Sequence, residues 1–183
     1  MFDVIGFDAD DTLWHNESIF TITQEKFREM LHSHNTELVN QTLSSTQIKN
    51  LKLFGYGIKG FILSMVETSV ELTNGEIKGN EIQKIIDFGR EMLANPIELL
   101  PHVQEVIEDL SRKYRLLLIT KGDLIDQETK IARSGLADYF TGIEIVSDKN
   151  SETYEKIVST ITKKKQEVKS LIDQTHLGVF ENK

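Results

Sequence analysis

The sequence of 183 residues contains no cysteine. Disulfide bonds, thiolate metal sites and cysteine nucleophiles are therefore excluded. No run approaches the ~20 consecutive apolar residues that cross a bilayer. The N-terminus lacks the basic start and the long apolar stretch of a signal peptide. We therefore predict a cytoplasmic protein that has no membrane partner.

Basic residues are outnumbered by acidic ones. Lys plus Arg number 21 and Asp plus Glu number 29, which gives a net charge of −8. An acidic chain is a poor candidate for binding nucleic acid or anionic lipid, because both carry negative charge. The content of hydrophobic (39%) and charged (27%) residues is ordinary for a globular protein. We predict one globular core with a sizeable insertion, and no nucleic-acid partner.

Three short apolar runs have the pattern of strands that are buried in a parallel sheet. They lie at residues 2–7, 115–120 and 143–146. Residues with helical spacing alternate with these runs, at 103–110, 123–134 and 152–161. Such alternation is typical of the α/β class. We predict a Rossmann-like parallel sheet with helices on both faces.

The alternation is interrupted between residues 18 and 93, where apolar residues recur at helical spacing. Glycine and polar clusters punctuate this stretch, which predicts three or four inserted helices. Asn95-Pro96 marks its end, because the residue before a proline is disfavoured in a helix. We predict a Rossmann-like core of residues 1–15 and 96–183 and a helical domain of residues 16–95.

Polar side chains follow each predicted strand, at the edge of the sheet where ligands bind in α/β folds. They are Asp8, Asp10 and Thr12 after the first strand, Thr120, Lys121 and Asp123 after the second, and Ser147, Asp148 and Lys149 after the third. Carboxylates that are held close together repel each other unless a cation intervenes. The cluster therefore predicts a binding site at this edge.

The stretch Asp8-Ala9-Asp10-Asp11-Thr12 resembles the DxDxT signature of the haloacid dehalogenase superfamily. Thr120 resembles the second motif of that family, and Lys149 resembles the third. The helical insertion lies where the family places a C1-type cap domain. The resemblance extends over about the first 160 residues.

The resemblance implies a Mg²⁺-dependent phosphatase that acts on a small phosphorylated metabolite, a phosphate monoester. Asp8 would be the nucleophile that forms an aspartyl-phosphate, and Asp10 would be the general acid and base. Mg²⁺ would bind a carboxylate oxygen of Asp8 and the main-chain carbonyl of Asp10. Thr120 and Lys121 would bind the phosphate, and Lys149 would neutralise developing charge.

Asp10 also bears on the choice between activities. The dehalogenases of the superfamily lack an acid at this position and need no metal, so the resemblance favours phosphoryl transfer over carbon–halogen cleavage. For the neighbouring Asp11 we expect a helix-capping or solvent-facing carboxylate. For Trp14 we expect a packing role.

The fourth motif of the family, a strand that ends in Gly-Asp or Gly-Asn followed by another acid, has no clear match after Lys149. The nearest candidate is Asp173, in a stretch whose apolar spacing favours a helix. The sequence therefore predicts a core that is shortened at its C-terminal part, with an incomplete metal shell and a first strand at the sheet edge. Such an edge makes either a monomer or a homodimer possible. The alternative function is a catalytically impaired relative that binds phosphate or a partner protein.

Overall fold

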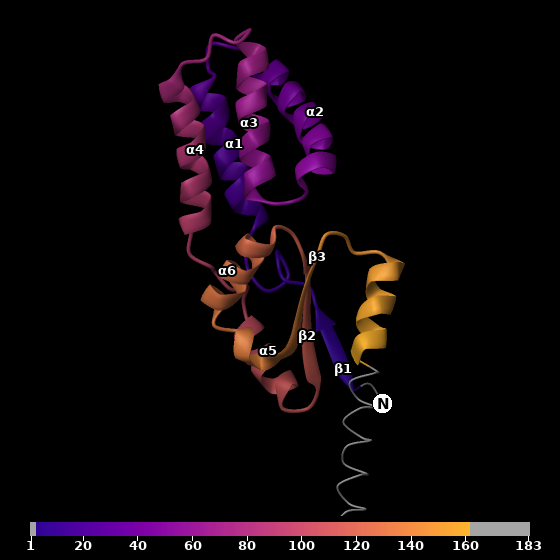
Figure 1. Cartoon of the computed structure of the whole chain (residues 1–183). Helices are drawn as coiled ribbons and strands as arrows, with labels where there is room; N and C mark the ends of the chain where they lie inside the picture. The colour runs from indigo at the N-terminus through magenta and orange to yellow at the C-terminus, as the bar shows by residue number, and fades with distance from the viewer. Residues whose placement is uncertain (1–2, 162–183) are drawn as a thin grey trace, which may run out of the picture. The chain divides into compact units, whose positions relative to one another are not determined.

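The computed structural model describes residues 3–161 (Figure 1). The chain divides into two compact units, Met1–Ser147 and Asp148–Lys183. In the second unit, residues 151–161 are helical, in agreement with the helix predicted there. The proposed domain boundaries at residues 16–95 stay a prediction. The described residues include no helix long and apolar enough to cross a membrane.

A parallel sheet forms the base of the first unit. Its described strands are β1 (Val4–Phe7), β2 (Arg115–Lys121) and β3 (Phe140–Val146), in the order β1-β2-β3. In the register, Phe7 pairs with Leu118 and Thr120 pairs with Ile145. The predicted α/β fold with a Rossmann-like parallel sheet is confirmed, and the carboxyl ends of the strands meet at one edge.

Two helices pack on the sheet beside β2. Helix α5 (Val103–Ser111) precedes this strand and α6 (Leu124–Ser134) follows it. Ile107 of α5 and Ile131 of α6 share an apolar cluster with Leu116 and Leu118 of β2. Alternate residues of a strand point to the same face, so both helices cover one face of the sheet. The prediction that helices also cover the other face stays a prediction.

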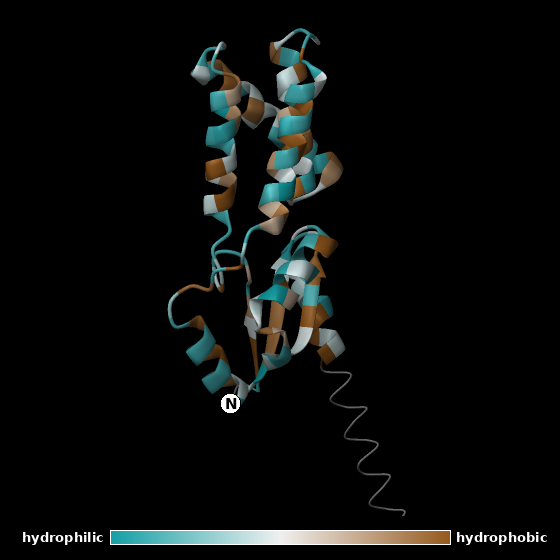
Figure 2. Ribbon diagram, turned by 90° about the vertical axis from the view of Figure 1, so that its left-hand side faces the viewer, coloured by the Kyte–Doolittle hydropathy of each residue, from teal (hydrophilic) through white to brown (hydrophobic). Residues whose placement is uncertain are grey.

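Helices α1 (Glu17–Met30), α2 (Thr36–Phe54), α3 (Ile58–Leu72) and α4 (Gly79–Ala94) form a bundle, as the spacing in the sequence predicts. The bundle has its own apolar cluster, which includes Phe27, Val39, Met65 and Ile85. Hydrophobic and hydrophilic residues alternate along these helices, as expected of helices with one buried face (Figure 2). The bundle is therefore an insertion between β1 and α5 with a core of its own.

Candidate active site

The turn that follows β1 is held by backbone and side-chain hydrogen bonds. The carbonyl of Ala9 accepts the N–H groups of Thr12 (3.1 Å) and Leu13 (2.7 Å). Asp11 adopts a positive φ of 56°, and its carboxylate accepts the N–H groups of Asn16 (2.9 Å) and Glu17 (3.1 Å) at the start of α1. The expectation of a helix-capping Asp11 is confirmed, and this cap ties the turn to the first helix of the bundle.

Asp10 lies at the centre of a hydrogen-bonded network. Its Oδ1 accepts from Trp14 Nε1 (2.8 Å), and its Oδ2 accepts from Gln127 Nε2 (2.8 Å). Lys130 Nζ lies 3.0 Å from both oxygens. Trp14 is fully buried, so its predicted packing role is confirmed, and its indole N–H also helps to fix Asp10. The carboxylate is thus held by donors from its own turn and from α6.

Gln127 connects Asp10 to Thr120. Thr120 is only 1% exposed, and its hydroxyl donates to Gln127 Oε1 at 3.2 Å. Because the amide oxygen faces Thr120 and the amide nitrogen faces Asp10, both ends of the Gln127 side chain are fixed. The structure therefore brings two predicted site residues, Thr120 and Asp10, into one network through a residue that the sequence reasoning missed.

Lys130 joins further polar groups to this network. Its Nζ also lies 3.3 Å from Asp126 Oδ2 and 3.1 Å from Asn16 Oδ1. Burial raises the pKa of Asp126, and the charges of Asp10 and Asp123 add to this increase, while Lys130 opposes it. Lys130 is thus the cation that two neighbouring carboxylates share.

The missed residues had a signal in the sequence. Asp126, Gln127 and Lys130 follow Asp123 by three, four and seven positions, along the stretch whose spacing predicts a helix. The structure starts α6 at this point, with Asp123 as its N-cap, whose side chain accepts the N–H of Asp126 at 3.1 Å. Polar residues with this spacing share one helix face, which here begins at the carboxyl end of β2.

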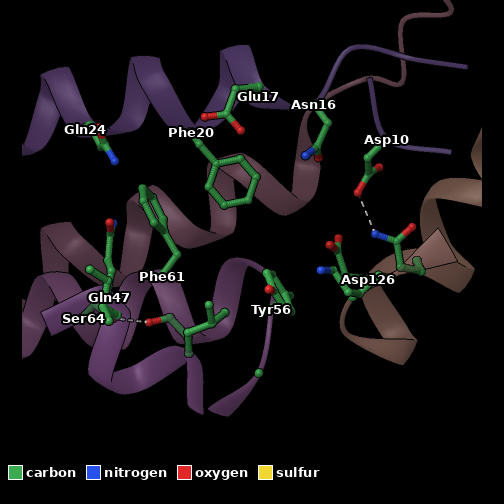
Figure 3. Close-up of a pocket in the computed structure, with 18 of the residues that line it drawn as sticks. Asp10, Asn16, Glu17, Phe20, Gln24, Gln47, Tyr56, Phe61, Ser64 and Asp126 are labelled. Carbon is green, nitrogen blue, oxygen red and sulfur yellow. Dashed lines mark hydrogen bonds between the residues drawn. The ribbon is translucent and has the colours of Figure 1, made fainter. Parts of the chain in front are cut away.

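A cavity of about 390 Å³ opens beside the network (Figure 3). Of the predicted site residues, Asp10 and Lys121 line it, whereas Asp8 and Thr120 are not among the lining residues. Asp8 is exposed at the end of β1, where its Oδ2 lies 3.5 Å from the hydroxyl of Thr12. Lys149 belongs to the second unit, and Asp173 lies outside the described residues.

The loop between α2 and α3, and the first turn of α3, contact the end of β2 and the N-cap of α6. The Tyr56 ring centroid lies 3.8 Å from Lys121 Nζ, and Lys59 Nζ lies 2.9 and 3.0 Å from the two carboxylate oxygens of Asp123. The hydrogen bond from Lys59 lowers the pKa of Asp123. Both contacts join the bundle to the polar edge of the sheet beside the cavity.

Gly57, in the loop between α2 and α3, offers a test of the contact between this loop and Asp123. Its φ is 119°, and an added Cβ would lie 3.1 Å from Asp123 Cβ. We expect Gly57→Ala to lower the free energy of unfolding by about 1 kcal/mol or more. The positive φ disfavours any side chain at this position, and Asp123 leaves little space for an added methyl group. Gly79→Ala is the matched control, because nothing lies within 4 Å of its added Cβ. Urea denaturation of both variants checks this, and equal effects would contradict it.

Comparison with known proteins identifies the family to which this chain belongs. The model of the haloacid dehalogenase-like hydrolase family matches residues 2–172. The chain therefore belongs to this family, and the family membership that the sequence predicts is confirmed. A crystal structure of a haloacid dehalogenase-like family hydrolase from Xanthomonas campestris is 42% identical, with a TM-score of 0.81 over 86% of this chain and 67% of that one.

More distant structures share the fold alone. The magnesium-bound HAD-hydrolase YfnB from Bacillus subtilis is 16% identical, with a TM-score of 0.51 over 79% of this chain and 63% of that one. A haloacid dehalogenase-like hydrolase from Burkholderia xenovorans is also 16% identical, with a TM-score of 0.58 over 89% of this chain and 68% of that one. The chain thus spans about two thirds of these proteins. No curated protein matches it.

Proposed function

We propose that this chain hydrolyses a small phosphate monoester through an aspartyl-phosphate on Asp8. The observation that supports this best is the fixed carboxylate of Asp10, two residues after Asp8 and at the edge of the cavity. A phosphatase needs a proton donor for the leaving alcohol, and such a donor is effective only when it is held in position. Carbon–halogen cleavage would give Asp10 no such task, because halide leaves as an anion.

Mg²⁺ fits the donors at the end of β1. The exposed carboxylate of Asp8 and the main-chain carbonyl of Asp10 offer oxygen, which Mg²⁺ prefers, and this ion commonly uses one or two carboxylates with water and phosphate oxygens. Within residues 3–161, no group of three or more His, Cys, Asp or Glu residues could hold a metal ion. Such a sparse set fits Mg²⁺ only with water and substrate as further ligands. When bound, the ion offsets the repulsion between phosphate and Asp8.

The proposed reaction has two steps. An oxygen of Asp8 attacks phosphorus and the ester P–O bond breaks. Asp10 enters this step protonated, gives its proton to the leaving oxygen and becomes the carboxylate. Water then attacks the phosphorus of the aspartyl-phosphate while Asp10 takes up a proton. This second step releases inorganic phosphate and restores the Asp8 carboxylate. Lys121 at the cavity wall and Lys149 are the proposed cations for the phosphoryl oxygens.

The proposal is tested by phosphate release from an aryl phosphate. We expect turnover with Mg²⁺, its loss in EDTA, and its recovery when excess Mg²⁺ is restored, since the ion offsets charge at the phosphate. Halide release from a 2-haloacid is measured in parallel. Metal-independent turnover, or halide release without phosphate release, would contradict the proposed phosphatase.

A further inference from the structure

The two ends of the cavity differ in charge. The end formed by the turn after β1, the last residue of β2 and helix α6 contributes four charged residues, Asp10, Lys121, Asp126 and Lys130. Among the described lining residues, helices α1–α3 and their loops contribute one charged side chain, Glu17, and no cation. Any ligand that reaches into the bundle therefore leaves the cations behind at the sheet end.

The bundle side of the cavity is aromatic and amide-rich instead. Phe20 of α1 and Phe61 of α3 meet edge to face, with ring centroids 4.9 Å apart. Figure 3 shows these rings between the Asp10 end and the opposite end, where Gln24 and Gln47 lie. Such rings offer apolar contact surface, and amides offer both hydrogen-bond donors and acceptors without charge.

We propose that the leaving group of the substrate is an uncharged alcohol that carries a ring, with hydrogen-bonding groups at the end distant from the phosphate. This inference rests on the proposed function, because it places the reacting phosphate at the Asp10 end of the cavity. The ring lies against Phe20 and Phe61, and its distal polar groups reach Gln24 and Gln47.

The charges that line the cavity favour an uncharged leaving group. A second anion on the leaving group would enter a region where Glu17 repels it and where no lysine or arginine of the described lining from α1–α3 compensates for its lost hydration. Size supports the ring. The cavity volume of about 390 Å³ lies within the range of ~300–1,000 Å³ that is typical of small-molecule sites, which exceeds the need of a two-carbon alcohol.

The test compares two matched esters, para-hydroxymethylphenyl phosphate and para-carboxyphenyl phosphate, which differ in one charge on the leaving group. Their affinities are measured by calorimetry with Mg²⁺ on the Asp8→Asn variant, so that hydrolysis does not consume them. We expect the neutral ester to bind roughly tenfold more tightly or better, because the anionic one meets an uncompensated like charge.

The possible outcomes separate the inference about the leaving group from the proposed hydrolysis. Equal binding, tighter binding of the carboxylate ester, or no binding of either ester would overturn the inference. A retained preference for the neutral ester, with no turnover by the unmodified chain, would support the inference about the cavity and overturn the proposed hydrolysis alone.

Glu17→Gln identifies the source of the preference. We expect it to narrow the difference between the two esters by about threefold or more, since it removes the repelling charge. Glu25→Gln is the control on the same helix, because Glu25 is exposed and is not among the residues that line the cavity. A preference that Glu17→Gln leaves unchanged would overturn the electrostatic argument.

Discussion

Replacing Asp8 by asparagine is expected to reduce phosphate release by at least about a thousandfold, because the amide cannot act as the nucleophile. The substitution keeps the size of the side chain and one oxygen at the end of β1. Asp8 is exposed, so we expect the fold to tolerate the change. Steady-state release of phosphate from an aryl ester, with Mg²⁺ present, measures the effect.

A matched control separates the nucleophile from a general loss of charge. Asp109→Asn makes the same change on the exposed surface of α5, where the side chain pairs with Lys113 at 3.3 Å. We expect this control to retain the full rate. Mass spectrometry of the acid-quenched reaction is expected to show a phosphorylated peptide that contains Asp8 in the unmodified chain and to lose it in Asp8→Asn. Phosphorylation elsewhere, or a rate unchanged in Asp8→Asn, would contradict the proposed intermediate.

The sequence predicted those parts of the fold that depend on local pattern. The apolar run at residues 115–120 and the helical spacing at 123–134 correspond closely to β2 and α6, because buried strands and amphipathic helices have distinct periods. The third strand begins at Phe140, earlier than the predicted Ile143. Thr141 and Gly142 interrupt its apolar pattern, although the backbone pairing with β2 includes Gly142.

Part of the site could also be predicted, but from the topology of the sheet and not from local periodicity. Asp10 and Thr120 could be placed at one edge of the sheet, because parallel strands end together. Their connection through Gln127 could not be predicted, since it depends on how α6 packs back on the strand ends, and this packing is a tertiary property. The cavity is still less local, because its walls come from three segments that are distant in the sequence. The roles of Asp8, Lys121 and Lys149 stay predictions.

Removing Lys130, the cation that Asp10 and Asp126 share, is expected to lower the free energy of unfolding more than the other substitutions proposed for this chain. Lys130→Met keeps much of the apolar stem but leaves two partly buried carboxylates without their cation, since the side chains of Asp10 and Asp126 are 21% and 8% exposed. Breaking a buried pair costs about 3–5 kcal/mol, and the partial exposure of Asp10 lowers our expectation to about 2–3 kcal/mol. Urea denaturation at neutral pH measures this loss.

Lys113→Met is the matched control, because Lys113 is exposed and its pair with Asp109 lies on the surface of α5. We expect this control to change the free energy of unfolding by less than about 0.5 kcal/mol. A loss of similar size in both variants would show that the Asp10 network contributes nothing specific.

The pH dependence of the Lys130→Met loss tests its electrostatic origin. The pKa of Asp126 in the folded chain is raised above its ordinary value of 3.8, although Lys130 opposes the increase. An acid with a raised folded pKa stabilises the fold below its unfolded pKa, and this contribution is lost as the pH rises through the folded pKa. Removing Lys130 raises that pKa further. The deficit of Lys130→Met relative to the unmodified chain is therefore greatest at neutral pH, and it shrinks as the pH falls toward 3.8. A deficit that stays constant over this range would instead indicate lost packing of the lysine stem.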